Sequence, residues 1–352
     1  MDNHTEVGLA TYHEITAQTD AWREATDVVS AQTTALEALW REDQYDNVVF
    51  TGCGSTYYLS LAAASLWQTL MNTPARGVPG GELYLYPRAS YGSLTGRRTL
   101  LVAVSRSGTT SETIAAVRQF KARNLGDVIV VTNYSDTPLA ALGDITITIP
   151  AGQEQSVAQT RSFASMYVAT TALTATLAGD NVLLGTMNQL PGAGKTLIAN
   201  SETLAKTVGE NLDLDRFYFL GSGPRYGLAC EVNLKMKEMT LTHSEPFHFF
   251  EFRHGPMSMV NERAAVIGLL SDQNQDHEAQ VLREMADLGG HILSLADTDA
   301  DISFVTGLPE VIRNVLYLPA LQLMAYYRSV AKGLNPDQPN NLTAVIELDL
   351  VV

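Results

Sequence analysis

Short runs of apolar residues recur along the whole chain, separated by stretches with helical spacing. The strongest run, residues 100–104, is five consecutive apolar or small residues and predicts a buried parallel strand. Similar runs predict strands at residues 48–51, 82–86, 128–132 and 145–149, and then at 216–220, 265–270, 291–295 and 302–305. Strands that alternate with helices in this way are typical of parallel sheets covered on both faces.

Helical periodicity is found at residues 12–42, 57–70, 110–120, 196–210 and 226–242. Residues 162–179 carry no charge, but six hydroxyl side chains make a membrane span a poor interpretation. We therefore expect a buried helix there. Residues 179–195 contain four glycines and one proline, and this composition predicts a connection between domains.

The plan of the first half repeats in the second. Gly52 and Gly221 each follow a predicted strand and open a Gly/Ser loop, and they lie 169 positions apart (221 − 52). We expect an α/β protein with two tandem doubly wound domains. The expected boundaries are a helical segment at 1–45, domains at 46–195 and 196–335, and a tail at 336–352.

Composition narrows the range of partners and compartments. The chain has 352 residues, 45% of them apolar, and a net charge of −15, which argues against nucleic acid as the main partner. The two cysteines, Cys53 and Cys230, have no metal-like neighbours and fit a reducing compartment. The polar N-terminus lacks an apolar signal core. We expect a cytoplasmic protein that does not enter the membrane.

The loop after residues 100–104 is rich in hydroxyl groups and contains Gly108. A hydroxyl-rich turn at a helix N-terminus binds anions, because the first backbone N–H groups lack partners and the helix dipole is positive there. An ordinary capped turn is the alternative. We favour a phosphate loop, because five hydroxyls flank one glycine: Ser105, Ser107, Thr109, Thr110 and Ser111. The corresponding loop of the second copy, residues 271–276, is acidic and is not expected to hold phosphate.

The helix predicted at 226–242 places three charged residues on one stripe inside its apolar surface: Glu231, Lys235 and Glu238. Internal pairing alone would explain them, because buried charges are costly unless paired. A carboxylate beside a lysine is also a tuned acid–base group, and we favour catalysis. The opposite face, with Asn233, Lys237 and Thr240, is expected to be polar.

Two further stretches suggest walls of a pocket. His254 precedes Gly255-Pro256 and therefore lies at a turn, which favours a pocket-facing imidazole over a core histidine. Residues 153–161 are polar beside the predicted buried helix, and a solvated loop is an equal alternative. The histidine and glutamate residues do not have the spacing of metal ligands, so we expect no metal site. We also expect no cofactor.

Four motifs in order resemble the sugar isomerase (SIS) family: TGCGSTYY, SRSGTTSET, LKMKEMTLTHSE…EFRHGP and the tail YYRSVAKGLNPDQPNNL. The likeness is to the isomerase half of glucosamine-6-phosphate synthases and to archaeal glucosamine-6-phosphate deaminases. It implies a flavodoxin-like fold for each domain. It also implies a homodimer in which the partner supplies the ring-opening histidine, here His254.

The resemblance implies a role for each matching position. Glu238 corresponds to the carboxylate that moves a proton between C1 and C2, with Lys235 and Glu231 as its neighbours. The positions matching sugar and phosphate contacts are Gly54, Ser55, Thr56, Ser105, Arg106, Ser107, Thr110, Val157 and Gln159. The family usually has serine where Gln159 stands. Arg106 could add charge to the phosphate site or be an outward surface residue.

Two departures shape the expected reaction. No glutaminase domain precedes Gly52, and Asp2 follows Met1 where a nucleophilic cysteine would be, so we expect no internal ammonia supply. Ala344 occupies the position of the tail lysine of the synthases, which argues against a Schiff-base role for the tail. We expect an isomerase and deaminase of an amino-sugar 6-phosphate. A fructosamine-6-phosphate deglycase and a non-catalytic phosphosugar-binding regulator are the alternatives.

Overall fold

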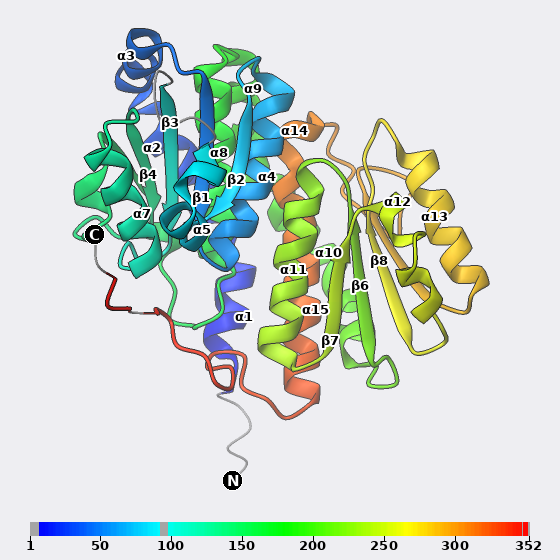
Figure 1. Ribbon diagram of the computed structural model, residues 1–352. Helices are drawn as coiled ribbons and strands as arrows, with labels where there is room; N and C mark the ends of the chain where they lie inside the picture. The colour runs from blue at the N-terminus through cyan, green and yellow to red at the C-terminus, as the bar shows by residue number, and fades with distance from the viewer. Residues whose placement is uncertain (1–6, 92–97, 347, 351–352) are drawn as a thin grey trace. The chain divides into compact units, whose positions relative to one another are not determined.

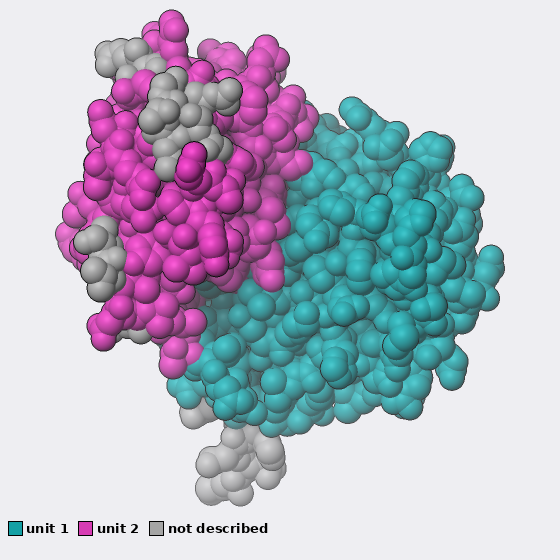
Figure 2. Space-filling view, viewed as in Figure 1, with its two compact units in different colours: residues 1–19, 154–160, 191–342 teal, residues 20–153, 161–190, 343–352 magenta. Residues whose placement is uncertain are grey.

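The computed structural model describes residues 7–91, 98–346 and 348–350. Contacts divide the chain into two compact units (Figure 2). Unit 1 comprises residues 1–19, 154–160 and 191–342, and unit 2 comprises residues 20–153, 161–190 and 343–352. Each unit is assembled from three separate stretches of chain. The domain boundaries expected at residues 45, 195 and 335 remain predictions.

Unit 2 contains a five-stranded parallel sheet in the order β2-β1-β3-β4-β5 (Figure 1). Its strands are β1 (Asn47–Gly52), β2 (Ala75–Pro79), β3 (Thr99–Ser105), β4 (Val128–Thr132) and β5 (Ile145–Thr148). Every residue of β3 and β4 is buried, as the apolar runs predict. The helices are α2 (Gln18–Ser30), α3 (Thr33–Asp43), α4 (Ser55–Leu70), α5 (Gly80–Leu85), α6 (Pro87–Tyr91), α7 (Ser111–Ala122), α8 (Arg161–Leu177) and α9 (Asn181–Thr186).

Unit 1 contains the second five-stranded parallel sheet, in the order β10-β9-β8-β6-β7. Its strands are β6 (Arg216–Gly221), β7 (His243–Phe247), β8 (Ala264–Leu269), β9 (His291–Ala296) and β10 (Ile302–Ser303). Its helices are α1 (Leu9–Thr16), α10 (Leu190–Glu210), α11 (Pro224–Thr240), α12 (Phe249–Phe252), α13 (Gln275–Asp287), α14 (Glu310–Arg313) and α15 (Leu318–Ala331). Short 3₁₀ turns across both units are Ala140–Leu142, Pro150–Gly152, Met187–Gln189, Pro256–Met259 and Asn314–Tyr317.

The two sheets have the same strand order when each is numbered from its own first strand. In each, the first strand lies between the second and the third, and the fourth and fifth follow outward, which is the flavodoxin-like order 2-1-3-4-5. This confirms the predicted repeat and the α/β fold class. Ligands of such sheets bind beyond the carboxyl ends of the strands, where the first and third strands diverge.

The uncharged helix is buried, as predicted. All residues of α8 from Ser162 to Leu177 are buried. Several of its hydroxyl groups bond within the helix: Thr171 donates to the carbonyl of Tyr167 at 3.0 Å, and Thr174 donates to the carbonyl of Thr170 at 2.8 Å. Among the described residues, no helix is both long and apolar enough to span a membrane.

The strand predicted at residues 82–86 is wrong. Those residues lie mostly in α5, and the strand precedes them as β2. No residue of β2 is fully buried, so this edge strand has no apolar run by which a sequence pattern could reveal it. Of the apolar residues that suggested a strand, Leu83 is in the core, whereas Leu85 is 62% exposed and Tyr86 is 60% exposed.

Two other local predictions agree with the structure. The chain passes from unit 2 to unit 1 between Leu190 and Pro191, within the stretch 179–195 that was predicted to connect domains. That stretch is itself largely helical, and Pro191 lies in the first turn of α10, where its missing N–H costs nothing. The helical pattern at 12–42 is divided among α1, α2 and α3.

Candidate active site

The predicted phosphate loop joins the end of β3 to the start of α7. Ser105 Oγ accepts a hydrogen bond from the Gly108 amide at 3.1 Å. Ser107 Oγ accepts from the Thr109 amide at 3.2 Å and from the Thr109 hydroxyl at 3.0 Å. These bonds fold the loop into a compact turn in front of the α7 N-terminus, where helix geometry leaves backbone N–H groups for a ligand.

Gly108 is required by this turn. Its φ of +65° is in the left-handed region, and a Cβ here would lie 2.1 Å from Thr137 Oγ1. We expect Gly108→Ala to lower the melting temperature, because backbone strain of this kind costs about 1–3 kcal/mol. We also expect weaker binding of inorganic phosphate.

The control for that substitution is Gly81→Ala, because nothing lies within 4 Å of the added methyl group at Gly81. Thermal unfolding and phosphate titration of both variants check the prediction. Equal behaviour of the two variants would contradict it.

The second predicted wall of the sugar site lies beside this loop in the same unit. Strands β1 and β3 are neighbours, with Thr51 opposite Ala103, so the loops that follow them emerge at the same edge of the sheet. Gly54 has a φ of +57°, and Ser55 is buried at the start of α4. Thr56 Oγ1 accepts from the Cys53 amide at 2.9 Å and donates to the Cys53 carbonyl at 3.0 Å, so this hydroxyl braces the loop.

Arg106 is buried, not an outward surface residue. It is 8% exposed, and its guanidinium donates to the carbonyl of Ala344 at 3.0 Å. The amide of Leu348 donates to Ser111 Oγ at 2.9 Å. The C-terminal tail therefore lies against the phosphate loop within unit 2, held at both ends of the loop.

Three charged side chains on α11 form two ion pairs that share Lys235. Lys235 Nζ lies 2.7 Å from Glu238 Oε2 and 3.3 Å from Glu231 Oε1. Glu231 and Lys235 are fully buried, whereas the Glu238 side chain is 19% exposed. Burial opposes the charge of Lys235, but the attraction of the two carboxylates outweighs it and the pKa of Lys235 is raised. The triad thus keeps one lysine cation between a buried carboxylate and a reachable one.

The expectation of a polar face opposite this stripe is wrong for two of its three residues. Asn233 and Thr240 are buried, and only Lys237 is exposed. The reason is that α11 packs against β6, β7 and α15 (Figure 1), which cover it on several sides. Thr240 meets this burial by hydrogen bonding to the carbonyl of Met236.

His254 lies at a turn, as predicted, just after α12. Its amide donates to the Glu251 carbonyl at 3.0 Å, and Gly255 continues the turn with a φ of +127°. The residue is exposed, and within the described chain its imidazole makes no hydrogen bond or ion pair. The structure therefore does not join His254 to the α11 triad within unit 1. Its neighbour Arg253 is fixed by two 2.7 Å bonds to Glu284.

Residues 154–160 belong to unit 1, although the chain on both sides of them belongs to unit 2. Val157 and Gln159 are half-buried, and the residues between and beside them are buried: Ser156, Ala158 and Thr160. The Val157 amide donates to the carbonyl of Asp337 at 2.9 Å. This segment is anchored rather than solvated, which favours the pocket-wall interpretation.

The acidic loop after β8 is occupied by internal bonds. The Ser271 amide donates to Glu278 Oε2 at 2.6 Å, and the Asp272 amide donates to Glu310 Oε2 at 3.2 Å. Arg225 pairs with Glu310, and Arg313 pairs with Asp272. Carboxylates of the chain thus occupy the amides that phosphate would need, in agreement with the prediction that this copy does not hold phosphate.

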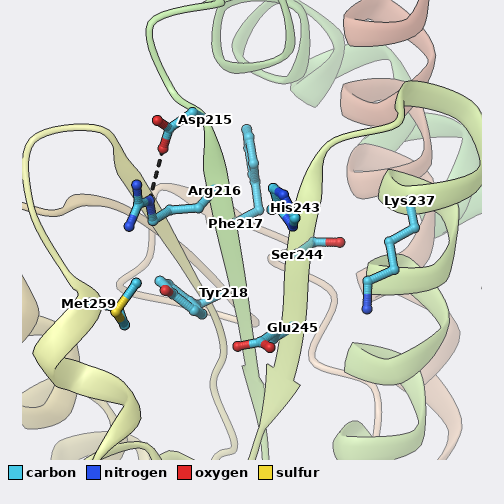
Figure 3. A pocket seen from close by; sticks show the side chains of 9 residues that line it. All are labelled: Asp215, Arg216, Phe217, Tyr218, Lys237, His243, Ser244, Glu245 and Met259. Carbon is cyan, nitrogen blue, oxygen red and sulfur yellow. Dashed lines mark hydrogen bonds and ion pairs between the residues drawn. The ribbon is translucent and has the colours of Figure 1, made fainter.

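A separate pocket of about 580 Å³ lies over β6 and β7 (Figure 3). Arg216 and Tyr218 lie on one side of β6, and Phe217 lies on the other. The lining residues are Asp215, Arg216, Phe217, Tyr218, Lys237, His243, Ser244, Glu245 and Met259. Asp215, Arg216 and His243 mark the amino ends of the strands, opposite to the edge where parallel sheets bind ligands, so we do not assign the sugar to this pocket.

The sequence profile of the SIS domain matches residues 43–176 and 213–303. The chain belongs to the SIS-domain family. It is 28% identical over 319 residues to the isomerizing glutamine–fructose-6-phosphate aminotransferase of Pyrococcus horikoshii, covering 87% of this chain and 52% of that protein. The Thermococcus kodakarensis enzyme of the same name is also 28% identical, over 325 residues, with the same coverage of both chains. The chain thus spans about half the length of the curated relatives it matches.

Solved structures share the fold. The glucosamine-6-phosphate deaminase of Thermotoga maritima superposes with a TM-score of 0.76 at 25% identity, over 92% of this chain and 100% of that one. The tagatose-6-phosphate ketose/aldose isomerase of Escherichia coli superposes with a TM-score of 0.84 at 21% identity, over 95% of this chain and 96% of that one. At that level of identity the second match speaks for the fold alone.

Proposed function

We propose that the protein is a phosphosugar isomerase that also deaminates an amino-sugar 6-phosphate, with glucosamine 6-phosphate as the leading substrate. The observation that carries the proposal is the reachable Glu238 carboxylate paired with the buried Lys235 at 2.7 Å. Family membership and the names of its relatives support a phosphosugar substrate. A cytoplasmic homodimer is part of this proposal.

Three groups of residues take part in the proposed reaction. The loop 105–110 and the α7 N-terminus of unit 2 bind the phosphate and so orient the sugar. The segment around Val157 and Gln159 in unit 1 contacts the sugar. His254, exposed and without a polar partner in the described chain, opens the ring, and we assign it to the active site of the partner subunit.

Glu238 then carries the proton. It removes the proton from C2 of the open-chain aldose form, the electron pair of the C–H bond forms a C1=C2 double bond, and the aldehyde oxygen takes up a proton to give an enol-type intermediate. The same proton from C2 returns to C1 and the amine nitrogen gives up a proton, which leaves an imine at C2 and a hydroxyl at C1. Water adds to this carbon and ammonia leaves, so glucosamine 6-phosphate and water give fructose 6-phosphate and ammonia. Lys235 holds the Glu238 carboxylate in position through their 2.7 Å ion pair.

The C-terminal tail favours a reaction in which water hydrolyses the imine over one in which a tail lysine forms a Schiff base. Ala344 offers no amine, and its carbonyl is bonded to Arg106 at 3.0 Å. The same feature is compatible with a deglycase that releases a larger amine from a fructosamine 6-phosphate. A panel of amino-sugar phosphates and fructosamine phosphates, scored for ammonia, amine and hexose phosphate, separates the two. Absence of turnover on the whole panel, with binding retained, would favour the regulator and overturn the proposal.

The phosphate loop gives a direct kinetic prediction. Ser107→Ala combined with Thr110→Ala removes one hydroxyl that braces the loop and another at the α7 N-terminus. We expect KM for the phosphosugar to rise by about tenfold with little change in kcat, since neutral hydrogen bonds contribute about 0.5–1.5 kcal/mol each. The exposed Ser135→Ala on a neighbouring loop is the control. Unchanged kinetics in the double variant would remove this loop from the site.

A further inference from the structure

Residues 154–160 are held by carboxylate groups near both ends of the segment, all within unit 1. Glu14 Oε1 accepts from the Gln155 amide at 2.6 Å and from the Ser156 amide at 3.3 Å, and Glu14 Oε2 accepts from the Ser156 hydroxyl. At the far end, Glu154 Oε1 accepts from the Thr160 amide at 2.7 Å and from the Thr160 hydroxyl at 2.9 Å. Such charge-assisted bonds are the stronger class of hydrogen bond.

The middle of the segment is tied to the same helix by a second route. The Val157 amide donates to the carbonyl of Asp337, and Asp337 Oδ1 accepts from the Thr11 amide at 2.8 Å and its hydroxyl at 2.7 Å. Thr11 and Glu14 are one turn apart on α1 and both are buried. Helix α1 therefore fixes the segment directly through Glu14 and indirectly through Asp337.

Among the described residues, no cation pairs with the buried Glu14 carboxylate. It is 2% exposed, it makes no ion pair within the described chain, and its bonds go to the segment alone. Burial and the nearby Glu154 raise its pKa, and the bonds from residues 155 and 156 oppose that rise. Burying a carboxylate without an ion pair costs free energy, so it is a poor way to stabilise a fold. Its hydrogen bonds to one short segment do fix the local geometry of that segment.

We propose that Glu14 is a positioning residue that holds residues 154–160 so that Val157 and Gln159 face the sugar. This inference rests on the proposed function, because the sugar contacts of Val157 and Gln159 belong to it. The alternation of buried Ser156, Ala158 and Thr160 with half-buried Val157 and Gln159 is the physical basis. One side of the segment is anchored through Glu14, Asp337 and Glu154. The other side carries Val157 and Gln159, which are proposed to face the sugar.

The test uses three variants of the full chain. Glu14→Ala removes both acceptors. Glu14→Gln keeps an amide oxygen for the two backbone N–H groups, and its amide nitrogen can donate to Ser156 Oγ, whose proton then goes to the Ala158 carbonyl, now 3.2 Å away. His13→Ala, the exposed neighbour on α1, is the matched control.

Two readouts are compared: amide hydrogen exchange of the peptide covering 153–161, and the affinity for glucosamine 6-phosphate alongside that for inorganic phosphate. In Glu14→Ala we expect exchange at residues 155–157 to rise at least tenfold and sugar-phosphate affinity to fall about tenfold, with phosphate affinity unchanged. Glu14→Gln should restore most of both. Where turnover is measured, KM should rise more than kcat falls.

Each contrary result has a distinct meaning. If exchange in Glu14→Ala matches that of His13→Ala, Glu14 does not hold the segment and the inference is wrong. If exchange rises but sugar-phosphate affinity does not change, the segment is not a sugar wall and the inference is again wrong. The proposed function fails separately, when the wild-type protein turns over no member of the phosphosugar panel, since the exchange and affinity comparisons do not require turnover.

Discussion

Glu238→Gln is expected to reduce kcat for the phosphosugar by about 10²–10⁴-fold, the usual contribution of a positioned acid–base group. The amide has the same shape as the carboxylate but cannot accept the C2 proton. Binding should survive, because the proposed phosphate site is the loop 105–110 and not α11. Steady-state kinetics together with equilibrium binding of glucosamine 6-phosphate measure the two effects separately.

The control for this variant is Glu245→Gln, an exposed glutamate on β7 of the same unit. It should behave as wild type in both assays. Full activity of Glu238→Gln would exclude this carboxylate as the proton carrier. Loss of binding and of activity together would mean that the variant disturbs the site as a whole.

Lys235→Met is expected to cause the largest loss of stability. The lysine is fully buried between Glu231 and Glu238, and Glu231 is fully buried as well. Removing one partner of a buried ion pair typically costs about 3–5 kcal/mol, because a buried charge loses its compensation. Urea unfolding of the variant should show a lower midpoint with an unchanged slope.

A second substitution tests the cause of that loss. The double variant Lys235→Met with Glu231→Gln removes the uncompensated charge and should recover a large part of the stability, without recovering activity. A double variant no more stable than the single one would show that the loss comes from packing around residue 235 and not from charge.

The features visible in the sequence are those with a strong local pattern. The run at 100–104 identifies β3 because a strand buried on both faces must be continuously apolar. The Glu231–Lys235–Glu238 stripe follows from helical spacing alone. The burial of Glu231 and Lys235 is confirmed, whereas Glu238 is partly exposed. The repeat was likewise predictable from the sequence. So was the shared position of the loops that follow β1 and β3, because loops after parallel strands meet at one sheet edge.

What the sequence did not reveal depends on distant partners. The edge strand β2 is paired on one side only and has no apolar run, so the sequence pattern predicts a strand at its neighbour α5 instead. The helical pattern places Asn233 and Thr240 on a polar face, because nothing local shows that α15 and β7 pack against α11. Glu14 was missed for the same reason, since the amides it accepts from lie 141 and 142 positions away.

We propose that this protein breaks the C2–H bond of a phosphorylated amino sugar through Glu238. Glucosamine 6-phosphate deuterated at C2, followed by deuterium NMR during incubation with wild type and with Glu238→Gln, reports directly on that bond. We expect wild type to move deuterium to C1 of fructose 6-phosphate or release it to water, and Glu238→Gln to leave it at C2. Complete retention of deuterium at C2 with the wild-type protein, or equal loss of the label with both proteins, would contradict it.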